Sequence, residues 1–192
     1  VHAAMGARVE IDAASWTNEA SGLLSTTGGS IELGGAWTNL GQVNAVGGEI
    51  DLGGAFTTAG SGINDARIVG TADTRLVISG DLDNAGATFD ASGFAGTVEL
   101  DGGAVRGGSL LVADALGFSN SINNELDGVA VSGNLRLDRS SSTVQLLGGA
   151  TVAGDIELSG NSSRLLLRDT QTLAADVRAT GSNANVSVEG DS

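Results

Sequence analysis

The chain has no cysteine, no proline, no tyrosine and no lysine, so all nine of its basic residues are arginine. Without cysteine there is no disulfide framework, no thiolate metal site and no cysteine nucleophile. The lack of proline fits a backbone whose N–H groups are engaged in ladders, because each proline would remove one donor. Aromatic residues make up only 3% of the chain. The core must therefore be built from Ala, Val, Leu and Ile, and large aromatic binding surfaces are not expected.

Cations are scarce, and the nine arginines face 23 acidic residues, which gives a formal charge of −14. Such a chain is repelled by phosphate backbones, so we expect no nucleic-acid partner. No apolar run approaches the roughly 20 residues that span a bilayer, so we expect no membrane span in this segment. The chain begins at Val1 without a basic and apolar leader. We therefore expect an excised or processed piece of a longer protein.

One strand-like phrase recurs along the chain. The stretch "SIELGGAW" (30–37) soon returns as "EIDLGGAF" (49–56), and "VELDGGAVRGGSL" (98–110) matches "VQLLGGATVAGDI" (144–156) at an offset of 46. We interpret the offset of 46 as close to two repeats. The chain is thus read as an array of similar units.

The last third is the most regular part of the array. Segments 131–151, 152–172 and 173–192 align one below another, which defines a 21-residue period. This period predicts two aliphatic columns, which are Leu135, Ile156 and Val177 in one and Val144, Leu165 and Val186 in the other.

Within each unit, apolar and polar residues alternate, as in Ile31-Glu-Leu33 and Ile156-Glu-Leu158. Alternation with period two indicates half-buried strands, and the Gly, Asn, Ser and Asp between them indicate tight turns. The Gly-Gly pairs fit coil corners, because no phosphate-loop motif accompanies them. An antiparallel sandwich would also contain regular short strands, but it does not explain similarity at about 20 residues.

These patterns predict an all-β fold, a parallel β-helix or β-solenoid with about nine coils of roughly 19–26 residues and little or no helix. In such a stack Trp16, Trp37 and Phe56 form an aromatic column that Leu82 continues. We expect a single domain over residues 1–192. Within it, 1–70 holds the Trp/Phe-containing repeats, 71–129 the irregular coils with loops or widened turns, and 130–192 the regular 21-residue coils.

The phrase G-x-I-x-L-G-G-x-W-x-N-x-G-x-V, which begins at Gly29, resembles the β-helical repeats of large bacterial secreted surface proteins. Autotransporter passengers and filamentous-haemagglutinin-like exoproteins are examples. The resemblance covers most of residues 7–192 and concerns the style of the repeat. It implies a right-handed parallel β-helix, an extracellular or bacterial cell-surface location, and a role as a rigid stalk or adhesin.

Some β-helices are polysaccharide lyases or hydrolases, which need clustered carboxylates with a His or Arg. The only histidine is His2, and the Gly-His-Gly of polygalacturonases is absent. The remaining candidates are three aspartates with an arginine from a neighbouring coil, namely Asp81, Asp83 and Asp90 with Arg67 or Arg75. Outward aspartates are ordinary on solvated strands and turns, so we expect no catalytic site.

Two oxygen-rich stretches, "NNELDG" (123–128) and "DLDNAG" (81–86), echo the first half of a calcium loop. The candidate ligands are Asn123, Glu125 and Asp127, and Asp81, Asp83 and Asn84. Both stretches lack the acidic residue that closes an EF-hand loop, since Asn134 and Ser92 stand there. We expect no cofactor and plain polar turns, with calcium as the alternative.

The serines at 140–142, 162–163 and 182 fall close together in the 21-residue register, which predicts one exposed turn. Such a stripe could contact a ligand or carry glycans, and the Asn-x-Ser pattern occurs at Asn161 and Asn185. The alternative is a solvated corner without a partner.

The ends of a parallel β-helix leave backbone groups unpaired. The partners we expect are therefore further coils or copies of the chain at the open ends, with host-surface or matrix glycans as additional candidates. Three candidate functions remain, in order of preference. They are a structural segment of a secreted or cell-surface protein, a head-to-tail subunit of an extracellular filament, and a polysaccharide-binding or polysaccharide-cleaving protein.

Overall fold

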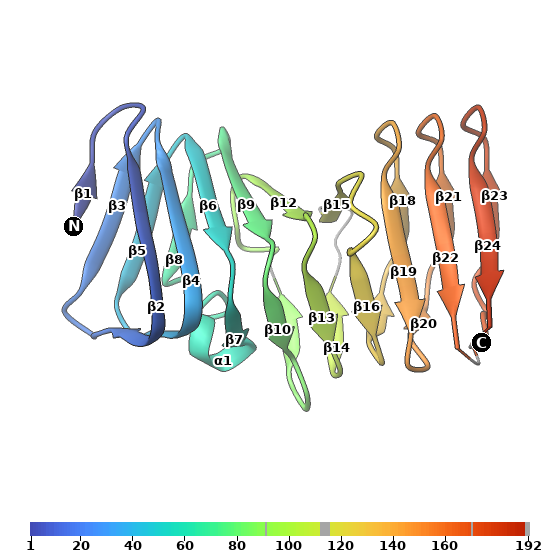
Figure 1. Ribbon diagram of the computed structural model, residues 1–192, viewed down its shortest axis with the longest axis horizontal. Helices are drawn as coiled ribbons and strands as arrows, with labels where there is room; N and C mark the ends of the chain where they lie inside the picture. The colour runs from blue at the N-terminus through green and yellow to red at the C-terminus, as the bar shows by residue number, and fades with distance from the viewer. Residues whose placement is uncertain (91, 112–115, 170, 191–192) are drawn as a thin grey trace.

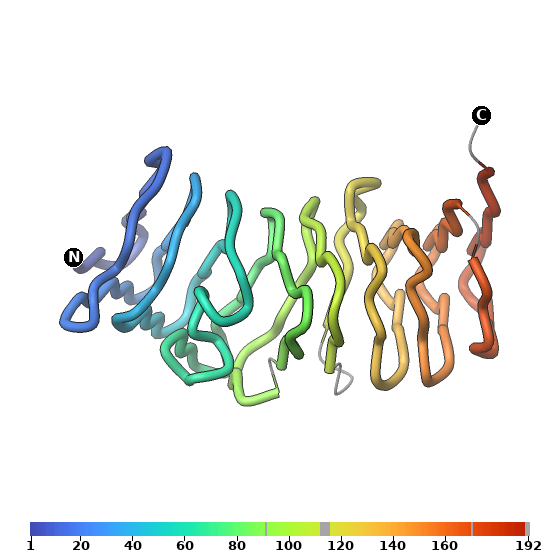
Figure 2. The backbone as a smooth tube through the Cα atoms, turned by 90° about the horizontal axis from the view of Figure 1, so that it is seen from below, coloured from blue at the N-terminus to red at the C-terminus, as the bar shows by residue number. Residues whose placement is uncertain are grey.

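The computed structural model describes residues 1–90, 92–111, 116–169 and 171–190. Parallel strands stack as a β-solenoid of about nine turns, and the chain advances as a rod from the N-terminus at one end to the C-terminus at the other (Figures 1 and 2). The predicted parallel solenoid is confirmed. Among the described residues the only helix is the single turn α1 (Thr58–Ser61), far too short to cross a membrane.

One long sheet runs the whole length of the rod, and three short sheets form the rest of the wall. Within the described residues the long sheet has 13 strands: β2 (Arg8–Asn18), β4 (Ser30–Asn39), β6 (Gly48–Leu52), β7 (Ala55–Thr57), β9 (Thr74–Ile78), β10 (Asp81–Asp83), β12 (Thr97–Leu100), β13 (Ala104–Arg106), β15 (Leu116–Phe118), β16 (Glu125–Asp127), β19 (Thr143–Leu147), β22 (Arg164–Arg168) and β24 (Asn185–Glu189).

The first short sheet contains β1 (His2–Ala3), β3 (Leu23–Thr27), β5 (Gln42–Val46) and β8 (Ile68–Gly70). The second contains β11 (Thr88–Asp90), β14 (Ser109–Leu111), β17 (Ala130–Ser132) and β20 (Thr151–Val152). The third contains β18 (Leu135–Leu137), β21 (Ile156–Leu158) and β23 (Val177–Ala179). The strand pairs that the structure describes are parallel, which is what stacked coils require.

One of the apolar columns in the interior of the rod lies behind the branch of the long sheet that runs from β2 and β4 through β7 and β10 to β24. Strand registers and ring stacking place these residues one above another: Trp16, Trp37, Phe56, Leu82, Val105, Leu126, Leu146, Leu167 and Val188. The ring centroids of Trp16 and Trp37 lie 6.1 Å apart, and those of Trp37 and Phe56 lie 4.6 Å apart. The predicted aromatic stack and its continuation by Leu82 are confirmed, and we call these nine residues the inner column.

The 21-residue register of the last third is also confirmed. Leu135 pairs with Ile156 and Ile156 with Val177, while Val144 pairs with Leu165 and Leu165 with Val186.

The similarity at an offset of 46 does not correspond to stacking. Val105 lies above Leu126, which lies above Leu146, so two coils in this part of the chain are shorter than that offset. The similar Gly-Gly phrases therefore stand at different corners. Coil length varies most in the middle of the chain, where the successive strand partners are Ile50, Leu76, Val98 and Leu116 and each coil is shorter than the one before. The longest of these coils accommodates α1.

Buried amides link neighbouring coils at one internal corner. The side chain of Asn18 donates to that of Asn39 (2.7 Å), and Asn39 donates to the carbonyl of Ser61 (3.2 Å). Further along, Thr58 donates to Asn84, and Asn84 donates to the carbonyl of Gly107. Because each of these buried amides has a partner, this corner can lie inside the wall without an unpaired donor.

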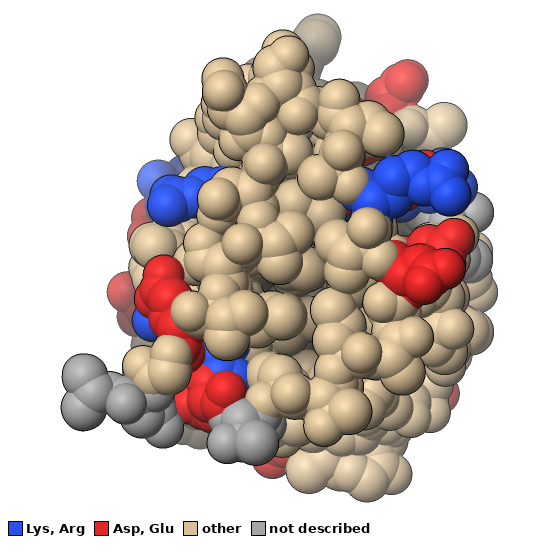
Figure 3. Space-filling model, turned by 90° about the vertical axis from the view of Figure 1, so that its right-hand side faces the viewer, with Lys and Arg blue, Asp and Glu red and all other residues tan. Residues whose placement is uncertain are grey.

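The two terminal coils expose apolar side chains. At the C-terminal end, Val177, Val186 and Val188 are 38%, 41% and 77% exposed, although the equivalent residues one coil earlier are mostly buried. Figure 3 looks onto this end, where uncharged residues cover the centre of the face and charged side chains lie towards its margin. Residues 191 and 192 lie outside the described part of the chain.

Candidate functional site

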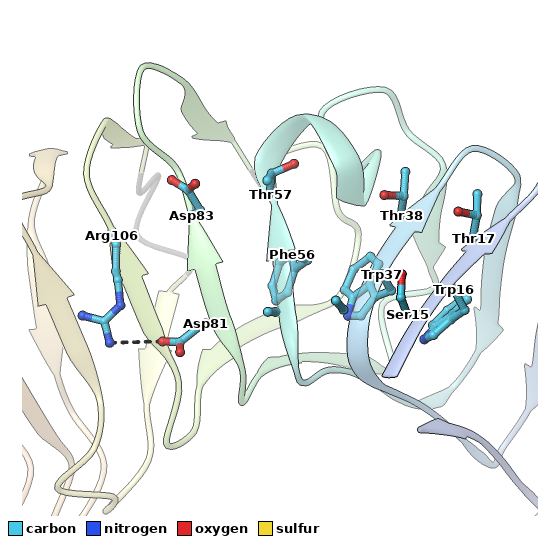
Figure 4. A pocket seen from close by; sticks show the side chains of 12 residues that line it. Ser15, Trp16, Thr17, Trp37, Thr38, Phe56, Thr57, Asp81, Asp83 and Arg106 are labelled. Atoms are coloured by element: carbon cyan, nitrogen blue, oxygen red, sulfur yellow. Dashed lines mark hydrogen bonds and ion pairs between the residues drawn. The ribbon is translucent and has the colours of Figure 1, made fainter. Parts of the chain in front are cut away.

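A shallow hollow of about 490 Å³ lies on the outer face of the long sheet, over β2, β4, β7 and β10 (Figure 4). Successive residues of a strand point to opposite faces. Because Trp16, Trp37 and Phe56 contribute to the core, their neighbours along each strand face outward. The hollow is therefore the outer side of the same strands whose inner side carries the aromatic stack.

The floor of the hollow is made of small residues, Ala36 and Ala55, and one side is a row of hydroxyls from Thr17, Thr38 and Thr57. Successive coils are about 4.8 Å apart, so the threonines present hydroxyl groups at that interval. Such a surface can exchange hydrogen bonds with a polar ligand that extends along the rod.

The rings of Trp37 and Phe56 beneath the hollow are not available for stacking against a ligand, and that of Trp16 is partly buried against the core. Trp37 and Phe56 are only 4% exposed. The indole N–H of Trp16 donates to the carbonyl of Gly34 (2.9 Å), and that of Trp37 to the carbonyl of Gly53 (2.8 Å). The rings therefore serve the core, and ligand contacts would come from hydroxyl and charged groups.

The charged end of the hollow is centred on Arg106. Its guanidinium lies 3.1 Å from Asp81, 3.4 Å from Glu125 and 2.9 Å from Asp127. Burial acts to lower the pKa of Arg106, but the hydrogen bonds to Asp127 and Asp81 outweigh it and raise the pKa. We call these four residues the Arg106 cluster.

The Arg106 cluster contains three of the six candidate calcium ligands. Asp81, Glu125 and Asp127 come together across successive coils, and a guanidinium occupies the space between them. Asp83 is exposed and accepts the backbone N–H of Ala85, and Asn123 is exposed on the turn before β16. Among the described residues no group of three His, Cys, Asp or Glu side chains is arranged to hold a metal ion.

The arginines considered for catalysis have other partners. Arg75 binds Glu49 and Glu99, and Arg67 lies 3.8 Å from Asp65.

The remaining catalytic candidates lie elsewhere. Asp90 accepts hydrogen bonds from Ser92, which lower the pKa of the carboxyl group. His2 lies on β1, with its Nδ1 atom 2.8 Å from the hydroxyl of Ser25. The described structure thus does not gather the candidate catalytic groups into one place.

A second ion cluster on the long sheet was not predicted from the sequence. The carboxylate of Glu99 is buried, 2.8 Å from Arg75 and 2.6 Å from Arg139. Arg139 reaches it beside Gly117, the residue opposite Glu99 in the next strand. Burial acts to raise the pKa of Glu99, but the hydrogen bonds from Arg139 and Arg75 hold it below its ordinary value. We call Arg75, Glu99 and Arg139 the Glu99 cluster.

The predicted serine turn is confirmed in part. Ser141 and Ser162 are successive members of one corner, where the backbone N–H of Ser141 donates to the carbonyl of Asn161 (2.7 Å). Ser142 and Ser163, however, are buried, and their hydroxyls donate to the carbonyls of Arg139 and Gly160. The exposed stripe is therefore narrower than the sequence indicated.

Comparisons of the chain with protein-family models, with curated proteins and with solved structures each find no match. The resemblance to autotransporter passengers and filamentous-haemagglutinin-like exoproteins accordingly stays a prediction beyond the fold itself. The class that the structure defines is a structural repeat protein of the β-solenoid type.

Proposed function

We propose that this chain is a rigid structural segment, a stalk or an adhesive rod, of a secreted or cell-surface bacterial protein. The observation that carries the proposal is the inner column, in which each of about nine coils contributes one apolar residue without interruption. A continuous core and a continuous backbone ladder give the rod no internal hinge.

Interactions between coils on the outer face support the same role. Arg106 links Asp81 on one neighbouring coil with Asp127 on the other, and Arg75 likewise links Glu49 with Glu99. Each such arginine connects three coils. Binding in this proposal is spread over a surface, with extracellular glycans as partners, and the chain does not act as an enzyme.

Electron microscopy of the purified chain tests the rod. We expect separate particles of uniform width with a length on the order of 40 Å, the product of about nine coils and the ladder spacing. Particles that bend at a fixed point would contradict a rigid segment. Antibody labelling of intact and lysed source cells tests the location, and signal confined to lysed cells would overturn it.

Head-to-tail stacking of copies is the second candidate. Trp16 and Val188 lie at opposite ends of the inner column, and Val188 is 77% exposed. A second copy placed on β24 would continue the column and the parallel ladder, a contact that does not close and therefore builds a fibre. In this case wild-type protein forms fibres as its concentration rises, and Val188→Glu abolishes them. Wild-type rods that stay single at high concentration exclude stacking.

A further inference from the structure

Arg164 differs from the other arginines in the charge of its surroundings. Within the described residues, seven of the nine arginines form ion pairs with acidic side chains: Arg8, Arg67, Arg75, Arg106, Arg136, Arg139 and Arg168. Arg164 and Arg178 have no such pair in that part of the chain. Arg178 nevertheless lies directly opposite Glu157 in register. Arg164 instead lies between Thr143 and Asn185, so both of its neighbours along the sheet are neutral.

Arg164 lines a hollow of about 480 Å³ at the serine corner, on the outside of β19, β22 and β24. The other lining residues carry only hydroxyl or amide groups: Asn120, Ser141, Thr143, Ser162, Asn183 and Asn185. No carboxylate lines it among the residues that the structure describes. In a chain with a formal charge of −14, this is an unusual local environment for a cation.

The corner presents the same geometry on three successive coils. Ser141, Ser162 and Asn183 have φ values of 62°, 59° and 58°, and they occupy equivalent positions of these coils. The backbone N–H groups of Ser141 and Ser162 are used in bonds between coils, 2.7 Å in each case. Their hydroxyls have no hydrogen-bond partner within the described residues. The hollow therefore offers free donors and acceptors in a repeating row beside one guanidinium.

We propose that this hollow binds an acidic saccharide that carries carboxylate groups. The guanidinium of Arg164 holds one carboxylate in a two-point contact, the geometry that arginine favours with this group. The serine hydroxyls and asparagine amides bind the sugar hydroxyls, because both groups donate and accept hydrogen bonds. The inference rests on the proposed function, since an extracellular rod meets such glycans.

The overall negative charge does not prevent this binding. At physiological ionic strength, charges in water are screened over about 8 Å. Acidic groups elsewhere on the rod are thus weakly felt, whereas Arg164 contacts the ligand directly. Binding that depends on one exposed ion pair weakens as salt is added.

Calorimetric titration with a tetramer of galacturonic acid tests the proposal, with a neutral galactose tetramer as the reference ligand. The variant is Arg164→Gln, and the matched control is Arg178→Gln, which changes the net charge equally on another sheet. We expect saturable binding of the acidic tetramer to the wild type and to the control, and binding about 10- to 100-fold weaker for Arg164→Gln. Arg164→Lys, which keeps the charge but loses the two-point contact, should bind with intermediate affinity.

Four results overturn the proposal. These are no saturable binding to the wild type, equal loss in both glutamine variants, equal affinity for the neutral tetramer, and equal affinity for sodium acetate. The last would identify a simple anion site. Micrographs of the same wild-type sample distinguish a failure of the saccharide proposal from a failure of the proposed function. Rods that do not bind the tetramer refute only the saccharide site. An absence of rods refutes the structural role.

Discussion

The inner and outer faces of the solenoid wall are made by alternate residues of the same strands, yet they differ in how similar their side chains are from one coil to the next. On the inner face, Leu82, Val105, Leu126 and Leu146 repeat one kind of side chain in four successive coils. On the outer face the equivalent neighbours are Asp81, Ala104, Glu125 and Gln145, which change from acid to methyl to acid to amide. The comparison teaches that stacking requires similar side chains where they are enclosed. On the outer face similarity is optional, so a stretch such as the threonine row can repeat while another holds a particular ion pair.

The largest effect is expected from a charge placed in the inner face. Ile156 is fully buried between Leu135 and Val177. Ile156→Asp buries an unpaired carboxylate, so we expect the free energy of unfolding to fall by about 4 kcal/mol or more and the C-terminal coils to unfold. The adjacent outward change Glu157→Gln should stay within about 0.5 kcal/mol. Thermal unfolding followed by circular dichroism measures both, and equal effects would mean that the register is wrong.

The next effect comes from the Glu99 cluster, the most enclosed charge of the outer face. Glu99→Gln removes two ion pairs to arginines that are 39% and 47% exposed, so solvent screening limits the loss to about 1–2 kcal/mol at neutral pH. Because the pKa of Glu99 is lowered in the folded state, its contribution is present above the ordinary value of 4.5 and is lost as the pH falls below it. Denaturant unfolding at pH 7 and pH 3 checks this. A difference between variant and wild type that persists unchanged at pH 3 would contradict the assignment.

A substitution in the Arg106 cluster should lower the stability less than one in the Glu99 cluster, because the side chains of the Arg106 cluster are more exposed. Arg106→Gln is expected to cost less than about 1 kcal/mol, and the loss should shrink in 1 M salt. The same variant leaves Asp81, Glu125 and Asp127 without their shared cation. Thermal unfolding with and without calcium chloride then tests the calcium alternative, because only the variant frees these carboxylates. Strong stabilisation of the wild type by calcium would instead favour a site that the arginine does not occupy.

The smallest expected effect on stability is a gain, which comes from replacing Asp51. Burial, followed by repulsion from Glu49, Glu32 and Asp101, raises the pKa of Asp51, although the hydrogen bond from Ser79 acts to lower it. Ionised Asp51 therefore lowers the stability of the fold at neutral pH. This destabilisation decreases as the pH falls through the raised pKa and is gone below the ordinary pKa of 3.8. Asp51→Asn should stabilise the protein by less than about 1 kcal/mol at pH 7 and by less at pH 4. Urea titrations at the two pH values decide, and destabilisation at pH 7 would refute the argument.

The inner face could be predicted because its signal is local and repeated. A fixed 21-residue period aligned Ile156 with its two neighbours, and the shared Gly-Gly-Ala phrase aligned Trp37 with Phe56. The same reliance on similar phrases failed at the offset of 46, because Gly-Gly pairs occur at more than one corner of a coil.

The outer face could not be predicted because its partners depend on the lengths of the intervening coils. Arg106 meets Asp81 of the preceding coil, and Glu99 meets Arg139 two coils further on, past Gly117 in the coil between them. Neither partner can be found by adding a fixed period to the residue number. The serine corner was anticipated as a stripe, but burial of Ser142 and Ser163 follows from hydrogen bonds to the turn itself, which composition does not reveal.

The regular register of the last coils makes the length of the rod a quantity that can be edited. Val131 lies above Val152, and Leu135 lies above Ile156, in one and the same register. Excision of residues 131–151 would join 130 directly to 152 and keep the buried columns in register, with Leu167 in the place of Leu146 above Leu126. Because most contacts join a coil to those beside it, the loss in stability should approximate the share of a single coil. The ion pair of Glu99 with Arg139, which spans the coil between them, would be lost in addition. A lineage could thus lengthen or shorten this molecule by whole coils, through duplication or deletion of the matching stretch of its gene, without redesigning its interior.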